Sequence, residues 1–176
     1  MTRETAATAR SYTPWQATAL VTLRLLIGWH FLYEGLGKLV NPYWSSASYL
    51  GEARWLFQNQ FLNIASSEAA LRVVDFLNVW GLTLIGLALL LGLFARAAAI
   101  GAVVLLALYY IVAPPFVGFT YAVPMEGSYL VVNKVLIELA AVLVLLAFPT
   151  SGIFGLDRFL PWTRPGAVGG LRRAQA

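Results

Sequence analysis

Four long stretches of apolar residues, separated by polar segments, dominate the hydropathy pattern of this chain. They cover about residues 15–40, 71–94, 97–117 and 129–148. Each is close to or above the roughly 20 residues that an α-helix needs to span the hydrocarbon layer of a membrane. A tight turn at 92–96 places two of these spans side by side and antiparallel. The pattern therefore predicts an all-α fold, an antiparallel four-helix transmembrane bundle.

The polar segments define the boundaries of this predicted bundle. Residues 1–14 form an N-terminal tail, 15–160 form one membrane domain, and 161–176 form a basic, flexible C-terminal tail. The longest connection, the outer loop 41–70, is rich in aromatic residues: Trp44, Tyr49, Trp55, Phe57 and Phe61. Two interpretations stay open for this loop, a short helix in the lipid headgroup layer or a lid over a site.

Arginine and lysine outside the spans are distributed unevenly between the two sides of the predicted membrane domain. One side carries seven arginines and the other carries two. The seven are Arg3, Arg10, Arg96, Arg158, Arg164, Arg172 and Arg173, and the two are Arg54 and Arg72. The positive-inside rule therefore predicts that both termini are cytoplasmic in a multi-pass protein of the cell inner (plasma) membrane.

The composition favours a membrane protein and excludes several other classes. Hydrophobic residues make up 60% of the 176 residues and charged residues 11%, whereas about 25% of a soluble domain is charged. The net charge of +4 resides mostly in the tails and one turn, which indicates contact with the lipid bilayer and no nucleic-acid binding. Cysteine is absent and histidine occurs once, which excludes disulfides, iron–sulfur clusters and bis-histidine haem. No metal centre and no covalent cofactor are predicted.

The first span is amphipathic. At about 100° per residue, Arg24, His30, Glu34 and Lys38 fall within one arc of about 120°. Ionisable groups at membrane depth are costly and nearly always face the interior of the bundle, where they find partners. We expect this polar stripe to face the other helices.

The fourth span carries polar residues in its first half, namely Asn133, Lys134 and Glu138. Because this span runs opposite to the first, Lys134 and Glu138 should lie at the depth of Glu34 and Lys38. Two cross-helix pairs are then geometrically feasible, Glu34 with Lys134 and Lys38 with Glu138. The spacing thus predicts a polar cluster in the outer half of the bundle.

Two further charged residues extend the predicted cluster. Asp75, near the outer start of the second span, can join the same layer. Arg24 lies deeper and has no acidic residue at its own depth, so its guanidinium needs a backbone carbonyl, a reach to Glu34, or an anionic ligand. One interpretation of the whole cluster is structural: the charges neutralise one another and fix which helices pack together. The other is a functional site, favoured by the number of polar groups and by His30, which titrates near neutral pH.

Residues 24–50, RLLIGWHFLYEGLGKLVNPYWSSASYL, resemble the DoxX/DoxD family of small four-helix membrane proteins. The matching pattern is an arginine opening the first helix, then a glycine, an acidic segment and a Gly-x-x-Lys-Leu ending. Residues 92–102 and 133–146 also look like that family, and the resemblance extends over about 17–160. It implies the membrane subunit of a quinone-linked oxidoreductase, of the type that oxidises thiosulfate and passes the electrons to membrane quinone. It also implies a second redox subunit as partner.

The leading hypothesis is that the polar cluster binds a quinone headgroup or a small oxyanion. Arg24, Lys38 and Lys134 would supply positive charge, while Asn133, Glu138 and Asp75 complete the ligand-binding set. The predicted catalytic residues are Glu34 and His30, which would exchange protons with the quinone, and Lys38. The alternative is a non-catalytic anchor or scaffold for a redox enzyme, ahead of a small-solute transporter. The charge-free third span offers a surface for a homo-oligomer.

Overall fold

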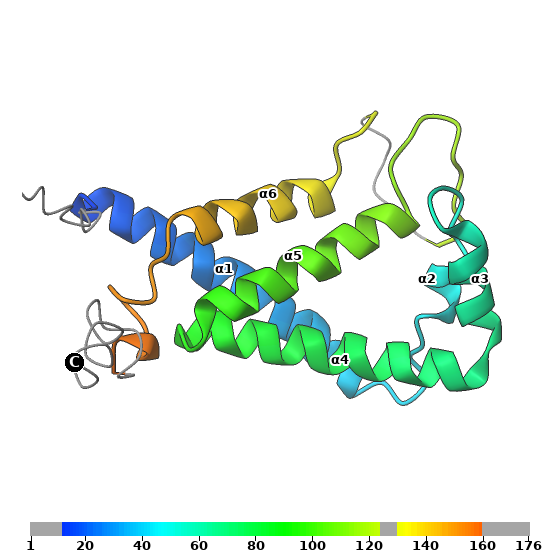
Figure 1. The fold of residues 1–176 in the computed structure, drawn as a ribbon, viewed down its shortest axis with the longest axis horizontal. Coiled ribbons are helices and arrows are strands. Elements are labelled where there is room, and N and C mark those ends of the chain that lie inside the picture. The colour runs from blue at the N-terminus through cyan, green and yellow to red at the C-terminus, as the bar shows by residue number, and fades with distance from the viewer. Residues whose placement is uncertain (1–11, 124–129, 160–176) are drawn as a thin grey trace, which may run out of the picture.

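The computed structural model describes residues 12–123 and 130–159, and the regular elements in this part of the chain are helices (Figure 1). In chain order they are α1 (Pro14–Leu39), α2 (Ala47–Leu50), α3 (Gln58–Ser66), α4 (Glu68–Leu91), α5 (Ala95–Val112), α6 (Lys134–Ala147) and the 3₁₀-helix η1 (Leu156–Phe159). The all-α prediction is confirmed. The predicted tails 1–14 and 161–176 lie almost wholly outside the described residues.

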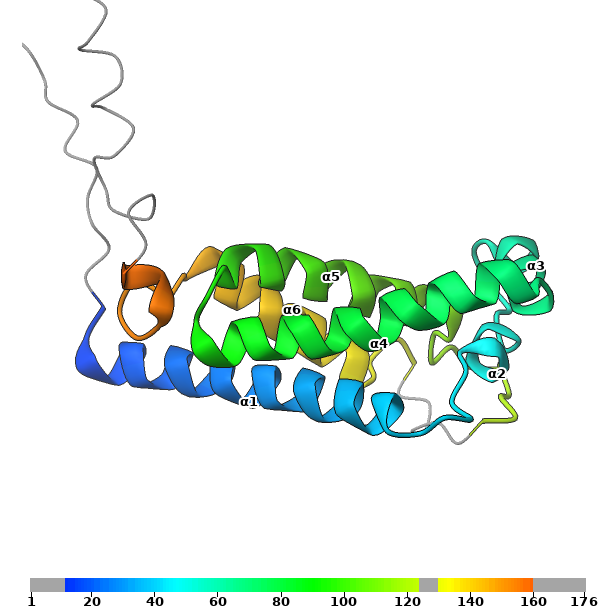
Figure 2. The same ribbon diagram turned by 90° about the horizontal axis from the view of Figure 1, so that it is seen from below.

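The long helices α1, α4, α5 and α6 form an elongated antiparallel bundle (Figure 2). α1 packs mainly against α4, α4 against α5, and α5 against α6. The core between them is built from aliphatic side chains and alanines, among them Leu82, Leu89, Ala99, Ala102 and Val142. The short helices α2 and α3 lie together at one end of the bundle, and η1 lies at the other end, beside the turn between α4 and α5 (Figures 1 and 2).

Two of the long helices, α4 and α5, are long and apolar enough to cross a membrane. α1 is longer, with 26 residues, but its polar stripe lowers its hydropathy. α6 has 14 residues, or about 21 Å at 1.5 Å per residue, which is shorter than the hydrocarbon core of about 30 Å. The crossing of the membrane by all four helices stays a prediction.

Local capping decides where the helices begin and end. Asn133 accepts a hydrogen bond from the Leu136 amide and caps α6, so this helix begins later than predicted. α4 ends at Gly92, whose φ of 61° lies in the left-handed region that suits glycine. α5 ends before Pro114, which cannot donate the hydrogen bond that would continue a helix. The helix predicted over 97–117 is therefore shorter at its C-terminal end.

Glycines let α1 and α4 approach until their backbones touch. A Cβ atom on Gly35 would lie 2.6 Å from the backbone nitrogen of Thr83, and one on Gly86 would collide with the backbone of Leu32. Small residues at such crossings allow the close packing that holds membrane helices together. This tight pair fixes the position of the polar stripe of α1 relative to α4.

The segment after α6 returns to the turn between α4 and α5. The Asp157 carboxylate accepts hydrogen bonds from the amides of Phe94, at 2.7 Å, and Ala95, at 3.3 Å. An acidic side chain at this place satisfies amides that have no partner inside the helix and favours the positive end of the helix dipole. Asp157 therefore caps α5 from a distant part of the chain.

Candidate functional site

A cavity of about 600 Å³ lies at the end of the bundle that holds α2. Its walls come from the C-terminal half of α1, the middle of α4, the C-terminal half of α5 and the start of α6. Segments 44–49 and 115–123 close it from the loop side. Pockets for small molecules and cofactors measure about 300–1,000 Å³, so the size suits a ligand with one or two rings.

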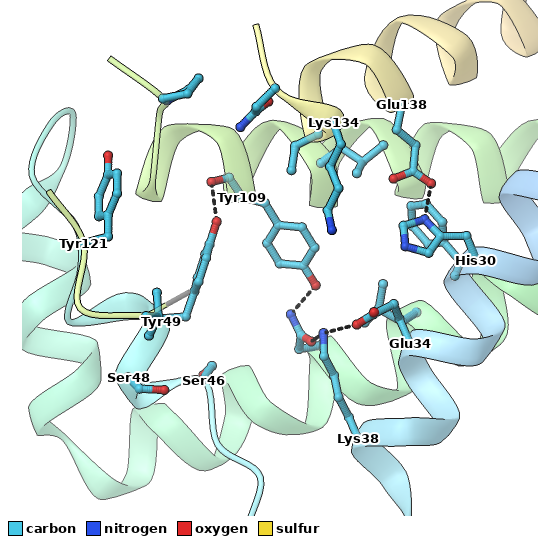
Figure 3. Close-up of a pocket in the computed structure, with 18 of the residues that line it drawn as sticks. His30, Glu34, Lys38, Ser46, Ser48, Tyr49, Tyr109, Tyr121, Lys134 and Glu138 are labelled. Carbon is cyan, nitrogen blue, oxygen red and sulfur yellow. Dashed lines mark hydrogen bonds and ion pairs between the residues drawn. The ribbon is translucent and has the colours of Figure 1, made fainter. Parts of the chain in front are cut away.

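His30 and Glu138 face each other across one wall of this cavity (Figure 3). The Nδ1 atom of His30 lies 2.7 Å from Oε1 of Glu138. The Glu138 side chain is 14% exposed and that of His30 is 44% exposed. The contact joins α1 to α6, and its half-exposed imidazole borders the cavity.

Lys38 lies at the opposite wall and binds two groups at once. Its Nζ donates to Oδ1 of Asn78 at 3.2 Å and lies 3.8 Å from Oε2 of Glu34, one turn earlier in α1. The Glu34 side chain is half exposed, whereas that of Lys38 is 18% exposed. The Nδ2 of Asn78 in turn donates to the hydroxyl of Tyr109 at 2.6 Å. These four residues form a continuous polar chain along the wall.

Lys134 and Asn133 enter from the first residues of α6. Lys134 lines the cavity, and its side chain points towards the interior between Tyr109 and His30 (Figure 3). Asn133 also lines the cavity, although its Oδ1 is used to cap α6. The start of α6 thus brings a second ammonium group to the wall opposite Lys38.

Aromatic side chains cover the loop side of the cavity. They belong to Trp44, Tyr49, Tyr109, Phe116, Phe119 and Tyr121. The Lys38 ammonium lies 5.1 Å from the centre of the Trp44 ring, within the range of a cation–π contact. The Tyr49 hydroxyl donates to the backbone carbonyl of Tyr109 at 2.8 Å. Burial raises the pKa of Tyr49, with a smaller contribution from Tyr109, so this hydroxyl stays protonated at neutral pH.

Arg24 does not belong to this cavity, in contrast to the ligand-binding role predicted for it. Its side chain is buried at the other end of the bundle, where Nη1 donates to Oγ1 of Thr150 at 3.1 Å and Nη2 to the carbonyl of Phe154 at 2.5 Å. Fourteen residues of helix separate Arg24 from Lys38, a distance of about 21 Å. The sequence left three partners open for the Arg24 guanidinium: a backbone carbonyl, Glu34 or an anionic ligand. The structure shows the first of these, the carbonyl of Phe154.

Asp75 is also outside the lining of the cavity. Its Oδ1 accepts hydrogen bonds from the amide of Ser46, at 2.8 Å, and from the Ser46 hydroxyl. Ser46 lines the cavity, and so does its neighbour Ser48. Asp75 therefore contacts the loop wall of the cavity through Ser46, and the ligand-binding role predicted for it stays a prediction.

One of the two predicted charge pairs, Lys38 with Glu138, is corrected. Glu138 pairs with His30 and not with Lys38, and Lys38 pairs with Glu34 on its own helix. The cluster itself forms: His30, Glu34, Lys38, Asn133, Lys134 and Glu138 all line one cavity. Within the outer loop 41–70, α3 is a short helix and residues of segment 44–49 line the cavity. The two interpretations of this loop, a helix in the headgroup layer or a lid over a site, stay predictions.

Sequence reasoning pointed to Trp44 and Tyr49 in the outer loop but missed Tyr109 and the three aromatic residues that follow α5. Tyr109 lies in the charge-free third span, and a tyrosine near the end of such a span is also typical of a membrane interface. Phe116, Phe119 and Tyr121 follow Pro114 in a segment without secondary structure. No spacing rule assigns such residues to a site, so only their positions in space reveal it.

Comparison with protein families gives one match. The family model DoxX matches residues 19–115, which is more than half of the chain. The match covers most of α1 and all of α2 to α5, and so includes Lys38, Asn78 and Tyr109. Searches of curated proteins and of solved structures find no match.

Proposed function

This chain belongs to the DoxX family of membrane proteins, and on that premise we propose that it is the membrane subunit of a quinone-linked oxidoreductase. In this proposal the 600 Å³ cavity binds the quinone headgroup. The observation that carries it is the convergence of two lysines, two glutamates and the single histidine on one aromatic-lined cavity. A purely structural charge network would need no space between its members.

The proposal places the cavity in the outer half of a bundle that crosses the inner membrane four times, with both termini cytoplasmic. Two kinds of observation support this arrangement. The long helices are antiparallel, and α4 and α5 are long and apolar enough to span. The basic turn at Arg96 lies at the end opposite to the cavity, as the positive-inside rule requires for a cytoplasmic turn.

The charges of the lining favour an uncharged ligand. Among the described lining residues, the two lysines and the two glutamates compensate one another, and His30 is the remaining titratable group that can be cationic. A small dianion such as thiosulfate would meet no excess of positive charge there while His30 is neutral. A quinone headgroup is neutral, offers two carbonyl oxygens to donors and stacks well against aromatic rings. The headgroup therefore fits this lining better than an oxyanion does.

Two residues are placed to exchange protons with such a ligand. Reduction of a quinone to a quinol takes two electrons and two protons, so acid groups must lie where the electrons arrive. Glu34 and His30 are both about half exposed and both border the cavity. The electrons would come from the redox centre of a second subunit, because this chain has no cysteine to hold an iron–sulfur cluster or to form a thiol relay.

The test is binding of menadione, a ring-only quinone, to the purified protein in lipid nanodiscs. We expect saturable binding to the wild type, weaker binding to Lys38→Met and to Glu34→Gln, and no change in Glu68→Gln, whose carboxylate is 85% exposed and outside the cavity. Thermal stability is followed in parallel. Absence of binding in the wild type, with Lys38→Met and Glu34→Gln merely less stable, would refute the proposal. Displacement of menadione by thiosulfate would instead indicate an oxyanion site.

A second function is a membrane anchor or scaffold for a redox enzyme. The specific observation in its favour is that the buried charges already have partners inside the protein, as Glu138 with His30 and Lys38 with Asn78. On this account the polar groups matter for folding and assembly alone. Co-purification with a redox subunit, without any intrinsic menadione binding, would identify this role.

A further inference from the structure

The hydrogen bonds that end at Tyr109 have a fixed direction. The chain begins at Lys38, whose ammonium group is a donor and never an acceptor. The amide oxygen of Asn78 must therefore face Lys38, at 3.2 Å, and the amide nitrogen must face Tyr109, at 2.6 Å. Exchanging the oxygen and nitrogen of Asn78 would bring two donors together at Lys38. The orientation of the amide is thus set by the charge next to it.

This direction decides what the Tyr109 hydroxyl can do. A phenol oxygen that accepts from an amide keeps its own proton for another acceptor. Within residues 12–123 and 130–159, the hydrogen bond from Asn78 is the one recorded for this hydroxyl. The hydroxyl lies at the cavity, between the wall formed by Lys38 and the Lys134 side chain (Figure 3). The hydroxyl oxygen already accepts from Asn78, so its proton is left for an acceptor in the cavity.

We propose that Tyr109 is a ligand-binding residue, and that its hydroxyl donates a hydrogen bond to a carbonyl oxygen of the bound headgroup. This inference rests on the proposed function and adds the recognition chemistry of the site. Lys38 and Asn78 act as positioning residues, because they orient the Tyr109 hydroxyl and hold its lone pair away from the ligand. The site then prefers ligands with a carbonyl acceptor over rings of the same shape without one.

Four proteins in nanodiscs test this: the wild type, Tyr109→Phe, Asn78→Asp and the double variant. Asn78→Asp keeps the size of the side chain but replaces the donor by a carboxylate, which accepts from Tyr109 and turns its proton away from the cavity. Tyr110→Phe is the matched control, since Tyr110 is the next residue and its hydroxyl donates to the Val131 carbonyl outside the cavity. Titration calorimetry measures the affinity for menadione and for 2-methylnaphthalene, which has the same ring system without carbonyls.

We expect Tyr109→Phe and Asn78→Asp each to weaken menadione binding by about five- to tenfold, the effect of one lost hydrogen bond. The double variant should be no weaker than Tyr109→Phe, because both changes remove the same bond. Binding of 2-methylnaphthalene should not change in any variant, and Tyr110→Phe should behave as the wild type. Equal loss for both ligands, or additive losses in the double variant, would overturn the inference and leave a packing role for Tyr109.

The outcomes separate this inference from the proposed function. If the wild type binds menadione and Tyr109→Phe binds it equally well, the recognition role of Tyr109 is wrong while the quinone site stands. If the wild type binds no menadione, both are wrong. Thermal unfolding of each variant shows whether a loss of binding reflects a loss of fold.

Discussion

His30 and Glu138 connect the first and the last long helices of the bundle through a contact of 2.7 Å between Nδ1 and Oε1. α1 packs mainly on α4, and α6 mainly on α5, so the two helices share little other surface. The contact therefore closes the bundle on the side where the cavity lies. It also leaves the remaining ring nitrogen of His30 for a ligand or a water molecule.

The coupling between His30 and Glu138 is the first prediction. Because the Glu138 side chain is mostly buried and that of His30 is about half exposed, the pair should stabilise the fold by about 1 kcal/mol. A double-mutant cycle with His30→Gln and Glu138→Gln, followed by unfolding in detergent, measures this energy. The same cycle with His30→Gln and Glu68→Gln is the control and should be additive. Additivity in both cycles would show that the contact contributes nothing.

The buried guanidinium of Arg24 gives a second prediction. Arg24 fastens the segment after α6 to the bundle through Thr150 and Phe154. Arg24→Gln should lower the free energy of unfolding by about 2 to 4 kcal/mol, because buried acceptors lose their donor. Arg96→Gln, at an exposed position of the same end, should change it little. The menadione affinity of folded Arg24→Gln should equal that of the wild type. A loss of affinity would show that Arg24 takes part in ligand binding after all.

The crossing of α1 and α4 gives a third prediction. A Cβ at Gly86 would collide with the backbone of Leu32, whereas one at Gly37 would meet no atom within 4 Å. Gly86→Ala should therefore cost about 1 to 3 kcal/mol through overpacking. Gly37→Ala should be neutral or slightly stabilising, since alanine favours a helix over glycine. Detergent unfolding of the two variants measures the difference, and equal stabilities would contradict the close approach of the helices.

The orientation in the membrane gives a fourth prediction, for which the absence of cysteine is an advantage. Tyr43→Cys places one thiol in the loop after α1, at a side chain that is 93% exposed. Phe159→Cys places one at the opposite end, in η1, at a side chain that is 64% exposed. A membrane-impermeant maleimide should label the first in cells with a permeabilised outer barrier and an intact inner membrane. It should label the second only after lysis, and the reverse pattern would invert the proposed topology.

Local sequence patterns are enough to predict the four long helices. Blocks of apolar residues, bounded by Pro114, Gly92 and charged turns, predict α-helices. In lipid, a helix lets each backbone group form its hydrogen bond within its own segment. The same pattern located the polar stripe on α1 and placed its C-terminal residues beside the polar start of α6. These predictions depend on local periodicity, which a single sequence contains in full.

The partners of the polar side chains follow from the tertiary structure. The sequence made Lys38 with Glu138 feasible, but the rotation of α1 on α4, fixed by the contact of Gly86 with Leu32, turns His30 towards Glu138 and Lys38 towards Asn78. Arg24 finds acceptors 126 and 130 residues away, and Tyr109 enters the cavity from α5, whose one charged residue, Arg96, lies at the opposite end of that helix. Helix rotation and the path of distant segments depend on the packing of the whole bundle. The periodicity of one segment carries no information about either of these. Yet helix rotation and chain path determine which polar groups meet.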